Sequence, residues 1–272
     1  MFITGNGFLN SAVLKQVELG GKDMLYRVEG IVIRSMDYGE GNKIITLCTE
    51  TNGKIGVLVR GAKKIKSRHA AMTQLFTYGE YVFFRQNGGL GTLNAGELID
   101  AHAALREDLF LAAYASYACE LLDKTLQDEE VGSFWFTQLK ASLEGLSAGK
   151  DPQIVIHLFE MKILQAAGYG PSFEACISCG RTDDLLVVSP RLGGKLCRSC
   201  RHHDPAALQI SPGTFKLLSL FEKMDLRRLG NIEVKDATKL ELKTVMRHFM
   251  DMQLGLRLKS RQFLDQLDKY EI

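Results

Sequence analysis

Two Cys-x-x-Cys pairs, Cys176 with Cys179 and Cys197 with Cys200, constrain the fold of this chain more than any other feature. A Cys-x-x-Cys turn can place two sulfurs on one metal ion, and two such turns complete the tetrahedral ligand set of structural zinc. Gly180 follows the first pair and supplies a chain reversal, as the glycines at 193 and 194 do before the second pair. The spacing therefore predicts one zinc ion held in a ribbon or knuckle.

Four thiolates leave no coordination position for water, so we expect the metal to stabilise the fold and not to act as a Lewis acid. The alternative is a pair of redox Cys-x-x-Cys motifs, which the absence of a surrounding βαβ pattern disfavours. His202 and His203 lie just past Cys200 and are interpreted as surface residues, with replacement of a ligand as the alternative. Cys48 and Cys119 stand in apolar patterns and are predicted to be small core residues.

Six cysteines in 272 residues are too few for a disulfide framework. The formal net charge is +2, so any basic surface must be local. No window approaches the ~20 apolar residues that cross a bilayer, and the N-terminus lacks a basic start followed by a long apolar run. We therefore expect a cytoplasmic protein.

The region Leu25–His102 is rich in β-branched and aromatic residues, and glycines interrupt it. Asn52-Gly53 and the glycines at 88 and 89 are typical of hairpin turns, which require positive φ. The pattern predicts five strands in an OB-type Greek-key barrel over residues 24–103, and an SH3-like barrel fits the same count. The expected strands are Tyr26–Arg34, Lys43–Thr49, Lys54–Arg60, Gly79–Gln86 and Leu93–Asp100.

Residues 1–23 precede a second methionine, Met24, and show little pattern. We interpret them as an N-terminal extension, contributed by an early start codon or by added sequence. A helix around Ala12–Glu18 is the alternative.

From residue 104 the apolar residues recur at helical spacing. Asp151-Pro152 is expected to open a helix that Gly168 ends, because proline at the first helical position loses only an N–H that would be unpaired there. Ser211-Pro212 predicts another helix start, and Asp236 is a candidate cap for a third. The chain is therefore predicted to be an α+β multidomain protein, with a helical domain at 104–168 and 205–272 interrupted by a zinc module at 169–204.

A basic stretch with no acidic residue runs from Lys54 to Arg68, through the third expected strand and past its end. It carries Lys54, Arg60, Lys63, Lys64, Lys66 and Arg68. On an OB-type barrel such a loop borders the nucleic-acid groove, where neutralising phosphates releases counterions. Tyr26, Tyr38, Phe83 and Phe84 are candidates for stacking on bases. The alternatives are a solvated loop and aromatic residues in the core.

Catalytic motifs are not evident in the sequence. A phosphate-binding loop, a paired-carboxylate metal site and a nucleophile elbow were sought, and only scattered acids and glycine pairs are present. The glycine-rich run at 88–91 lacks the lysine and the following helix of a phosphate cradle, so we interpret it as a hairpin. We expect a protein that is not an enzyme.

A series of short motifs runs through the chain from roughly Leu25 to Leu267. They are Gly30-Ile31-Val32, Tyr38-Gly39-Glu40, Gly53-Lys54, Arg60-Gly61-Ala62-Lys63-Lys64, Ser67-Arg68, Phe159-Glu160, Leu164, Gly168-Tyr169, Pro171, Cys179-Gly180, Gly193-Gly194, Leu258-Lys259-Ser260-Arg261 and Phe263-Leu264. In these motifs and in their order the sequence resembles the RecO family of bacterial recombination mediators.

The resemblance implies an OB-fold joined to a helical domain with the zinc unit, and a cytoplasmic, nucleoid-associated DNA repair protein. Such a protein binds single- and double-stranded DNA, anneals complementary strands and, with RecR, helps load RecA on DNA coated with single-strand-binding protein, in a functional link to RecF. The alternative is a non-enzymatic adaptor that docks RecR and single-strand-binding protein with only incidental DNA contact.

Carried over to this sequence, the DNA-contact candidates are Arg34, Lys43, Arg60, Lys63, Lys64, Lys66 and Arg68. Lys259 and Arg261 either extend the basic face or stabilise a helix C-terminus through its dipole, and we favour the helix-end role. Residues 1–23 depart from the family pattern. The four cysteines vary among family members, which supports a structural role for the zinc.

Overall fold

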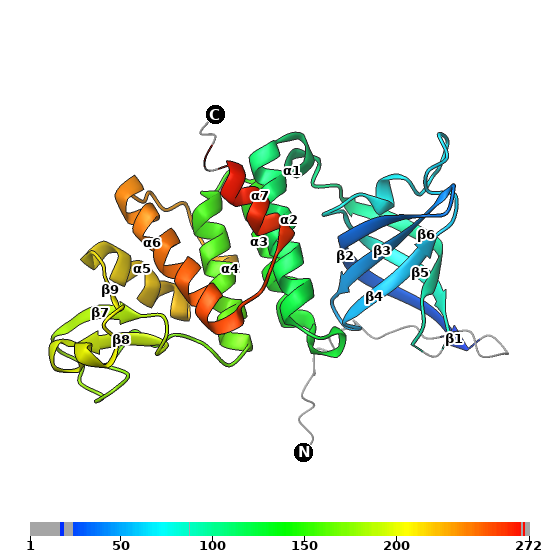
Figure 1. Ribbon diagram of the computed structural model, residues 1–272. Coiled ribbons are helices and arrows are strands. Elements are labelled where there is room, and N and C mark those ends of the chain that lie inside the picture. Colours follow the sequence, from blue (N-terminus) through cyan, green and yellow to red (C-terminus); the bar gives the residue numbers. More distant parts are fainter. Residues whose placement is uncertain (1–16, 19–23, 87, 268, 270–272) are drawn as a thin grey trace, which may run out of the picture.

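The computed structural model describes residues 17–18, 24–86, 88–267 and 269, and its parts lie in a row (Figure 1). A β-sheet domain stands at one end, a bundle of helices in the middle and a small three-stranded module at the other end. The expected extension at 1–23 lies outside the described residues apart from Val17–Glu18, which form a short strand, β1, beside Met24 and Leu25.

The N-terminal sheet has the order expected of an OB-type fold. Its long strands are β2 (Met24–Tyr38), β3 (Asn42–Thr49), β4 (Lys54–Val59), β5 (Tyr78–Arg85) and β6 (Gly91–Asp100). Successive pairings β2–β3, β3–β4, β4–β6, β6–β5 and β5–β2 return to the starting strand, and only β4–β6 is parallel. The prediction of a five-stranded, OB-type N-terminal domain is therefore confirmed.

The interior of this sheet is apolar because alternate residues of the strands point inward. Ile45, Leu47, Val57 and Tyr81 are completely buried and belong to one cluster. The turn between β3 and β4 places Gly53 at φ +70°, as expected of its Asn-Gly pair. The turn after β5 uses Gly88 at φ +75°.

The helical domain contains seven α-helices among the described residues. They are α1 (Ala103–Glu107), α2 (Leu109–Thr125), α3 (Ser133–Ser147), α4 (Pro152–Ala166), α5 (Pro212–Lys223), α6 (Asp236–Phe249) and α7 (Lys259–Leu267). Short helical turns occur at Ala71–Thr73, Asp128–Glu130, Leu226–Arg228 and Met250–Leu254. None of the helices described is long and apolar enough to cross a membrane.

The helix starts largely follow the predicted caps. The carboxylate of Asp151 accepts hydrogen bonds from the main-chain N–H groups of Gln153 and Ile154, at 3.0 and 3.3 Å. Ser211 Oγ accepts from the N–H of Thr214 at 3.3 Å. The prediction for α6 was wrong by one residue, because Lys235 occupies the cap position and Asp236 lies in the first turn, where a carboxylate still favours the helix dipole.

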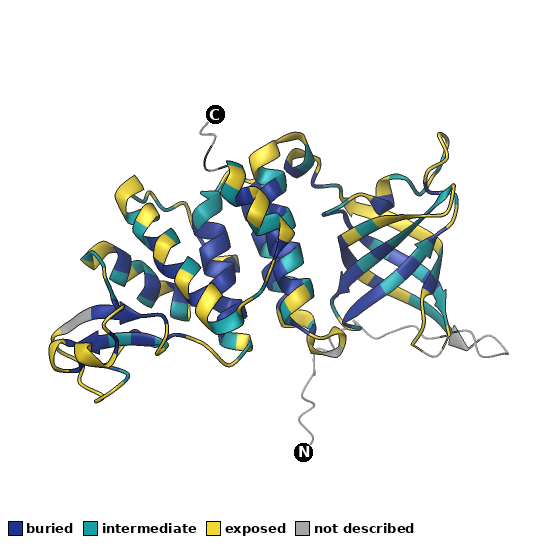
Figure 2. Cartoon of the chain, viewed as in Figure 1, coloured by how far each residue is buried: buried dark blue, intermediate teal, exposed yellow. Residues whose placement is uncertain are grey.

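The helical core continues into the β-sheet domain. One apolar cluster joins α2, α3 and α4 to Ile31, Ile33, Cys48, Phe76 and Tyr78, which lie on the N-terminal domain. Figure 2 shows the buried residues of α4 at the centre of the bundle and buried residues on the side of the sheet that faces it. The two parts therefore share a hydrophobic interface.

A buried lysine strengthens this interface. Lys54 Nζ, at the start of β4, donates hydrogen bonds to the carbonyl oxygens of Asp123 and Leu126 at 2.8 Å each. The same ammonium lies 3.2 Å from a carboxylate oxygen of Asp123 and of Asp128. Next to it, a Cβ on Gly53 would lie 2.0 Å from the carbonyl oxygen of Asp128, so the close approach requires glycine.

The small module lies between α4 and α5 in sequence. It has a three-stranded sheet of β7 (Leu185–Ser189), β8 (Gly194–Cys197) and β9 (Leu208–Gln209), and a short 3-10 helix at Arg198–His203. The second cysteine pair lies here, with Cys197 at the end of β8 and Cys200 in the 3-10 helix.

Candidate metal centre and nucleic-acid interface

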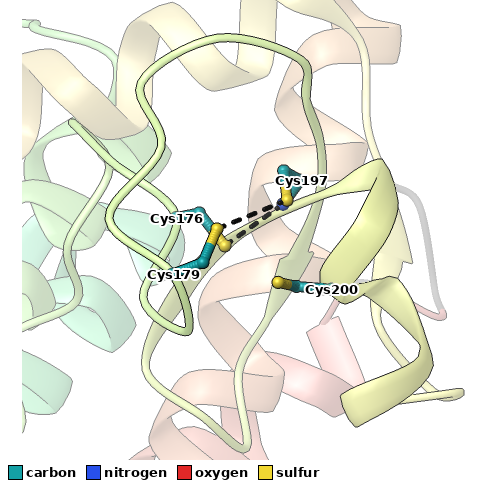
Figure 3. Close-up of side chains that lie close together, drawn as sticks. All are labelled: Cys176, Cys179, Cys197 and Cys200. Carbon is teal, nitrogen blue, oxygen red and sulfur yellow. Dashed lines mark hydrogen bonds between the residues drawn. The ribbon is translucent and has the colours of Figure 1, made fainter.

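The four predicted cysteines converge in the small module (Figure 3). The sulfurs of Cys176, Cys179, Cys197 and Cys200 all lie within 4.8 Å of one another, and the Sγ atoms of Cys179 and Cys197 are 3.7 Å apart. Cys176 and Cys179 come from the loop before β7, Cys197 ends β8, and Cys200 lies in the 3-10 helix. Three of the four are buried, and Cys179 is exposed. The group could hold one metal ion.

The backbone around the first pair explains how the sulfurs are held. Gly180 takes φ +74° and its N–H donates to the carbonyl of Cys176 at 2.8 Å, while the N–H of Cys176 donates to the carbonyl of Arg181 at 2.7 Å. These two hydrogen bonds close the turn that carries the sulfurs of Cys176 and Cys179. A Cβ on Gly194 would lie 2.3 Å from the carbonyl oxygen of Ser172, so the first loop also packs directly on β8.

The thiols of this group have unequal acidity. Burial raises the pKa of Cys176, but main-chain N–H groups of Cys197, Ser178 and Cys179 outweigh it and lower the pKa to about 6. For Cys200 a hydrogen bond from Ser178 works downward, yet burial and the neighbouring sulfurs raise its pKa to about 12. A thiolate therefore forms readily at Cys176, whereas burial and the neighbouring sulfurs disfavour one at Cys200. A divalent cation removes this conflict because coordination favours all four thiolates.

The donor set fits a closed metal site. Four soft thiolate ligands at this spacing suit tetrahedral zinc and leave no position for water. His202 and His203 are exposed and lie outside the four-cysteine group, with ring centroids 4.2 Å apart and His202 Nδ1 2.8 Å from the carbonyl oxygen of Ser199. Their interpretation as surface residues is confirmed.

The two remaining cysteines are buried in the protein core. Cys48 is 0% exposed and Cys119 is 1% exposed. Burial raises the pKa of the Cys48 thiol to about 12, and burial also raises that of Cys119. Since the thiolate is the reactive form, both side chains are inert core residues, as predicted.

The predicted basic loop connects β4 to the short helical turn at Ala71–Thr73 and belongs to the N-terminal domain. Arg60, Lys63, Lys64, Lys66 and Arg68 are all exposed. Two hydrogen bonds fix the base of the loop to the β2–β3 turn: the N–H of Lys63 donates to the carbonyl of Gly41 at 3.1 Å, and the N–H of Gly61 donates to Asn42 Oδ1 at 2.9 Å. The cations are therefore displayed at a defined end of the sheet.

The structure changes the interpretation of this stretch in two ways. Lys54 is not part of the exposed charge, because it is buried between the two domains. Asp37 on β2 supplies a counter-charge from outside the stretch, since it lies 2.5 Å from Lys63 Nζ and 3.7 Å from Lys43 Nζ. The hydrogen bond from Lys63 lowers the pKa of Asp37 and keeps it ionised.

Arg34 and Lys43 differ in their exposure. Arg34 is exposed on β2, next to a register shift between Val32 and Arg34, and such bulges re-aim side chains. Lys43 is half-buried beside Asp37. Arg34 is thus the more accessible of the two candidates.

The four aromatic candidates for base stacking also differ in their exposure. Phe83 is completely buried, and its ring stacks on Tyr26 with centroids 5.5 Å apart. These two rings stabilise the interior of the sheet. Tyr38 is 54% exposed at the end of β2, and Phe84 is half-buried. Only Tyr38 offers a largely free ring face.

The preferred interpretation of Lys259 and Arg261 was wrong. Lys259 begins α7 instead of ending a helix, and the main-chain N–H groups of Lys259 and Ser260 donate to the carboxylate of Glu120 at 3.2 and 2.8 Å. Arg261 is half-buried and donates two hydrogen bonds to Asp251, at 2.6 and 2.9 Å. Arg261 therefore takes no part in a free basic face.

A buried polar group inside the helical domain was also missed. The carboxylate of Glu160 accepts from Tyr117 Oη at 2.6 Å and lies 2.7 Å from His157 Nδ1. Burial raises the pKa of Glu160, but the attraction of His157 and its hydrogen bonds outweigh burial and lower it. The interpretation of α4 as core holds, with this network at its centre. Its only sequence signal is a helical i, i+3 spacing of His157 and Glu160 on an otherwise apolar helix.

Two family models match the chain, one on each side of the domain boundary. "Recombination protein O N terminal" matches residues 24–102, and "Recombination protein O C terminal" matches residues 106–262. A relative from Halalkalibacterium halodurans is 45% identical over 245 residues, which is 90% of this chain and 96% of that relative. A relative from Bacillus mycoides is 43% identical over 249 residues, 92% of this chain and 100% of that relative. Both are named DNA repair protein RecO.

Proposed function

This chain belongs to the RecO family of DNA repair and recombination proteins, and on that premise we propose that it is a non-enzymatic recombination mediator. It binds single- and double-stranded DNA, anneals complementary strands, and with RecR helps load RecA onto DNA coated with single-strand-binding protein. It thereby works beside RecF at the nucleoid. Residues 24–103 form the DNA-binding domain, and 104–168 with 205–272 form the helical domain around the module at 169–204.

The observation that carries this proposal is the cluster of exposed cations at one end of the sheet. Arg60, Lys63, Lys64, Lys66 and Arg68 lie within a single loop, and Asp37 is the only acid paired with any of them among the described residues. Each phosphate that such a surface neutralises releases counterions, which supplies binding free energy without reading sequence. A protein that anneals any complementary pair needs this kind of surface.

Annealing requires no bond to be made or broken in the protein's substrates other than base-pair hydrogen bonds. The protein must neutralise two phosphate backbones and leave the base edges free. Contacts from lysine and arginine side chains to phosphates meet both conditions. Tyr38, at the same end of β2, offers an exposed ring on which a base can stack.

We assign the metal of the four-cysteine group as zinc. Cys176, Cys179, Cys197 and Cys200 would hold it, and it would supply folding free energy to the small module. That module has its own small core, which contains Val187 and Leu196 beside the cysteines. A module of this size needs a metal or disulfides, since so few apolar residues cannot offset its conformational entropy.

The test is the rate at which complementary oligonucleotides coated with single-strand-binding protein anneal, measured with and without the chain across a salt series. We expect acceleration that fades as salt rises. The double variant Lys63→Glu with Lys64→Glu should lose most of the acceleration and show a flatter salt dependence of DNA binding. The matched control is Lys216→Glu with Arg228→Glu, which reverses two exposed charges on the helical domain.

The outcomes separate the proposal from the adaptor alternative. Equal loss in the loop variant and in the control would remove the basic loop from the DNA interface. No acceleration by the unaltered chain alone, with acceleration restored by RecR, would indicate an adaptor whose own DNA contact is incidental.

A further inference from the structure

A second cationic surface lies where the two domains meet. A cavity of about 350 Å³ opens between the N-terminal domain and the helices. Its charged lining residues are Arg34 on β2, Glu120, Asp123 and Lys124 on α2, and Lys259 on α7, and the hydroxyl side chains of Ser35 and Ser116 also line it. Its size matches the smaller pockets that bind low-molecular-weight groups. Nothing in the sequence indicated this cleft, because its residues come from four segments that are distant in sequence.

The two acids of the cleft are engaged with protein groups. The carboxylate of Glu120 accepts hydrogen bonds from the N–H groups of Lys259 and Ser260 and from Ser260 Oγ, at 2.5 Å for the hydroxyl. These donors lower the pKa of Glu120 although burial acts in the opposite direction. Asp123 lies beside the ammonium of Lys54. Neither carboxylate is therefore available to neutralise all the cations around it.

The cations of the cleft have few partners. Arg34 and Lys259 make no side-chain hydrogen bond or ion pair with any described residue, and Lys124 has only a longer-range attraction to Glu120. Lys259 stands in the first turn of α7, where the helix dipole disfavours a positive charge, so helix stability does not account for it. In the part of the chain that the structure describes, the buried hydroxyl of Ser35 has no hydrogen-bond partner.

We propose that this cleft binds one backbone phosphate of a single nucleic-acid strand that runs from the basic loop onto α2 and α7. Arg34, Lys124 and Lys259 neutralise the phosphate, and Ser35 Oγ donates to one of its oxygens. The proposal rests on the DNA binding proposed above and adds a second contact on the helical domain. It assigns Lys259 a role that the helix geometry leaves open.

The position and size of the cleft favour a nucleic-acid strand. Arg34 lies three residues along β2 from Asp37, the partner of Lys63, which corresponds to about 10 Å at the rise of a strand. A strand held by the loop thus reaches the cleft within one or two phosphates.

The test is the salt dependence of the affinity for a fluorescent single-stranded oligonucleotide, measured on the full chain. The cleft variant is Lys124→Gln with Lys259→Gln, the loop variant is Lys63→Gln with Lys64→Gln, and the control is Lys216→Gln with Arg228→Gln. All three remove two exposed positive charges. We expect the slope of log affinity against log salt to fall by about 0.7 in the cleft variant, from one lost phosphate contact, and to stay constant in the control.

A second variant separates binding from folding. Ser35→Ala removes the unpartnered hydroxyl, so the thermal midpoint should be unchanged or higher. The affinity for the oligonucleotide should nevertheless fall about two- to tenfold, the effect of one hydrogen bond.

The outcomes distinguish this inference from the proposed function. If the salt slope falls only in the loop variant and the cleft variant equals the control, the cleft does not bind a phosphate. The DNA interface would then be confined to the basic loop. Unchanged slopes in both variants would overturn both. Loss of binding to an aspartate-rich peptide with an unchanged DNA slope would assign the cleft to a protein partner and would also overturn the inference.

Discussion

Lys54 Nζ contacts both the carbonyl oxygen of Asp123, at 2.8 Å, and its carboxylate, at 3.2 Å. A charge from the second strand of the β3–β4 hairpin is thus held at the C-terminal end of α2. The ammonium has a third hydrogen bond to Leu126, so its donors are satisfied although the side chain is only 6% exposed. This arrangement fixes the N-terminal domain against the helices.

Replacement of Lys54 is expected to weaken the interface between the N-terminal domain and the helical domain. Lys54→Met should lower the free energy of unfolding by about 3 kcal/mol, because two carbonyl groups and the carboxylate of Asp123 lose their partner in a buried place. Urea unfolding followed by circular dichroism measures it, with the exposed Lys66→Met as control. An effect no larger than the control's would mean that Lys54 contributes nothing to the interface.

The neighbouring glycine provides a matched pair of variants. Gly53 and Gly88 take nearly the same φ, +70° and +75°, but a Cβ would meet the carbonyl of Asp128 only at Gly53, with nothing within 4 Å at Gly88. Gly88→Ala should cost about 1 kcal/mol for its backbone conformation alone. Gly53→Ala should cost several times as much, as measured by thermal unfolding. Equal losses would show that the two domains do not approach closely at this point.

Loss of one sulfur is expected to abolish metal binding. Cys197→Ser should release the metal and unfold the small module, because three thiolates and a hydroxyl form a much weaker tetrahedral site. Metal content by elemental analysis should fall from about one ion per chain to near zero. Cys48→Ala, a cysteine outside the group, should keep its metal. Full metal retention in Cys197→Ser would refute the four-thiolate site.

The buried Glu160 predicts a dependence of stability on pH. Because the pKa of Glu160 in the folded protein lies below its ordinary value of 4.5, its stabilisation is complete above that value and is lost as the pH falls through the lower folded value. Glu160→Gln should therefore show a shallower loss of unfolding free energy in acid than the unaltered protein, as measured by urea titrations from pH 7 to 3. The exposed Glu233→Gln serves as control. Parallel curves for Glu160→Gln and the unaltered protein would contradict the assignment.

The acid at the base of the basic loop should restrain DNA binding. Asp37→Asn removes the carboxylate that pairs with Lys63 and Lys43, and both cations become available to phosphates. We expect the affinity for single-stranded DNA at fixed salt to increase about two- to fivefold. Fluorescence anisotropy measures it, with Asp183→Asn on the small module as control. A weaker affinity would mean that Asp37 positions the loop instead.

The features that local patterns govern could be predicted from the sequence. Cysteine spacing located the metal site, and alternating apolar residues located the five long strands. Asp151-Pro152 and Ser211-Pro212 located two helix starts because a cap acts within four residues.

The predictions that were wrong concern contacts between segments that are distant in sequence. Lys54 was grouped with its sequence neighbours although it reaches Asp123, and Asp37 was overlooked because it neutralises Lys63 from another strand. The position of Lys259 at the start of a helix could have been predicted locally, because a glycine, Gly255, lies four residues before it and glycine commonly ends a helix. In the structure Gly255 takes φ +59° and ends the preceding helical segment.

The shared core has a consequence for synthesis. Ile31, Ile33 and Phe76 on the N-terminal domain are covered by helices that follow it in sequence, and α4, at the centre of the bundle, ends at Ala166. At 5–20 residues per second the ribosome needs roughly 3–13 seconds to add those helices after β6 is complete. During that interval the nascent domain exposes an apolar face, which makes it a client for chaperones.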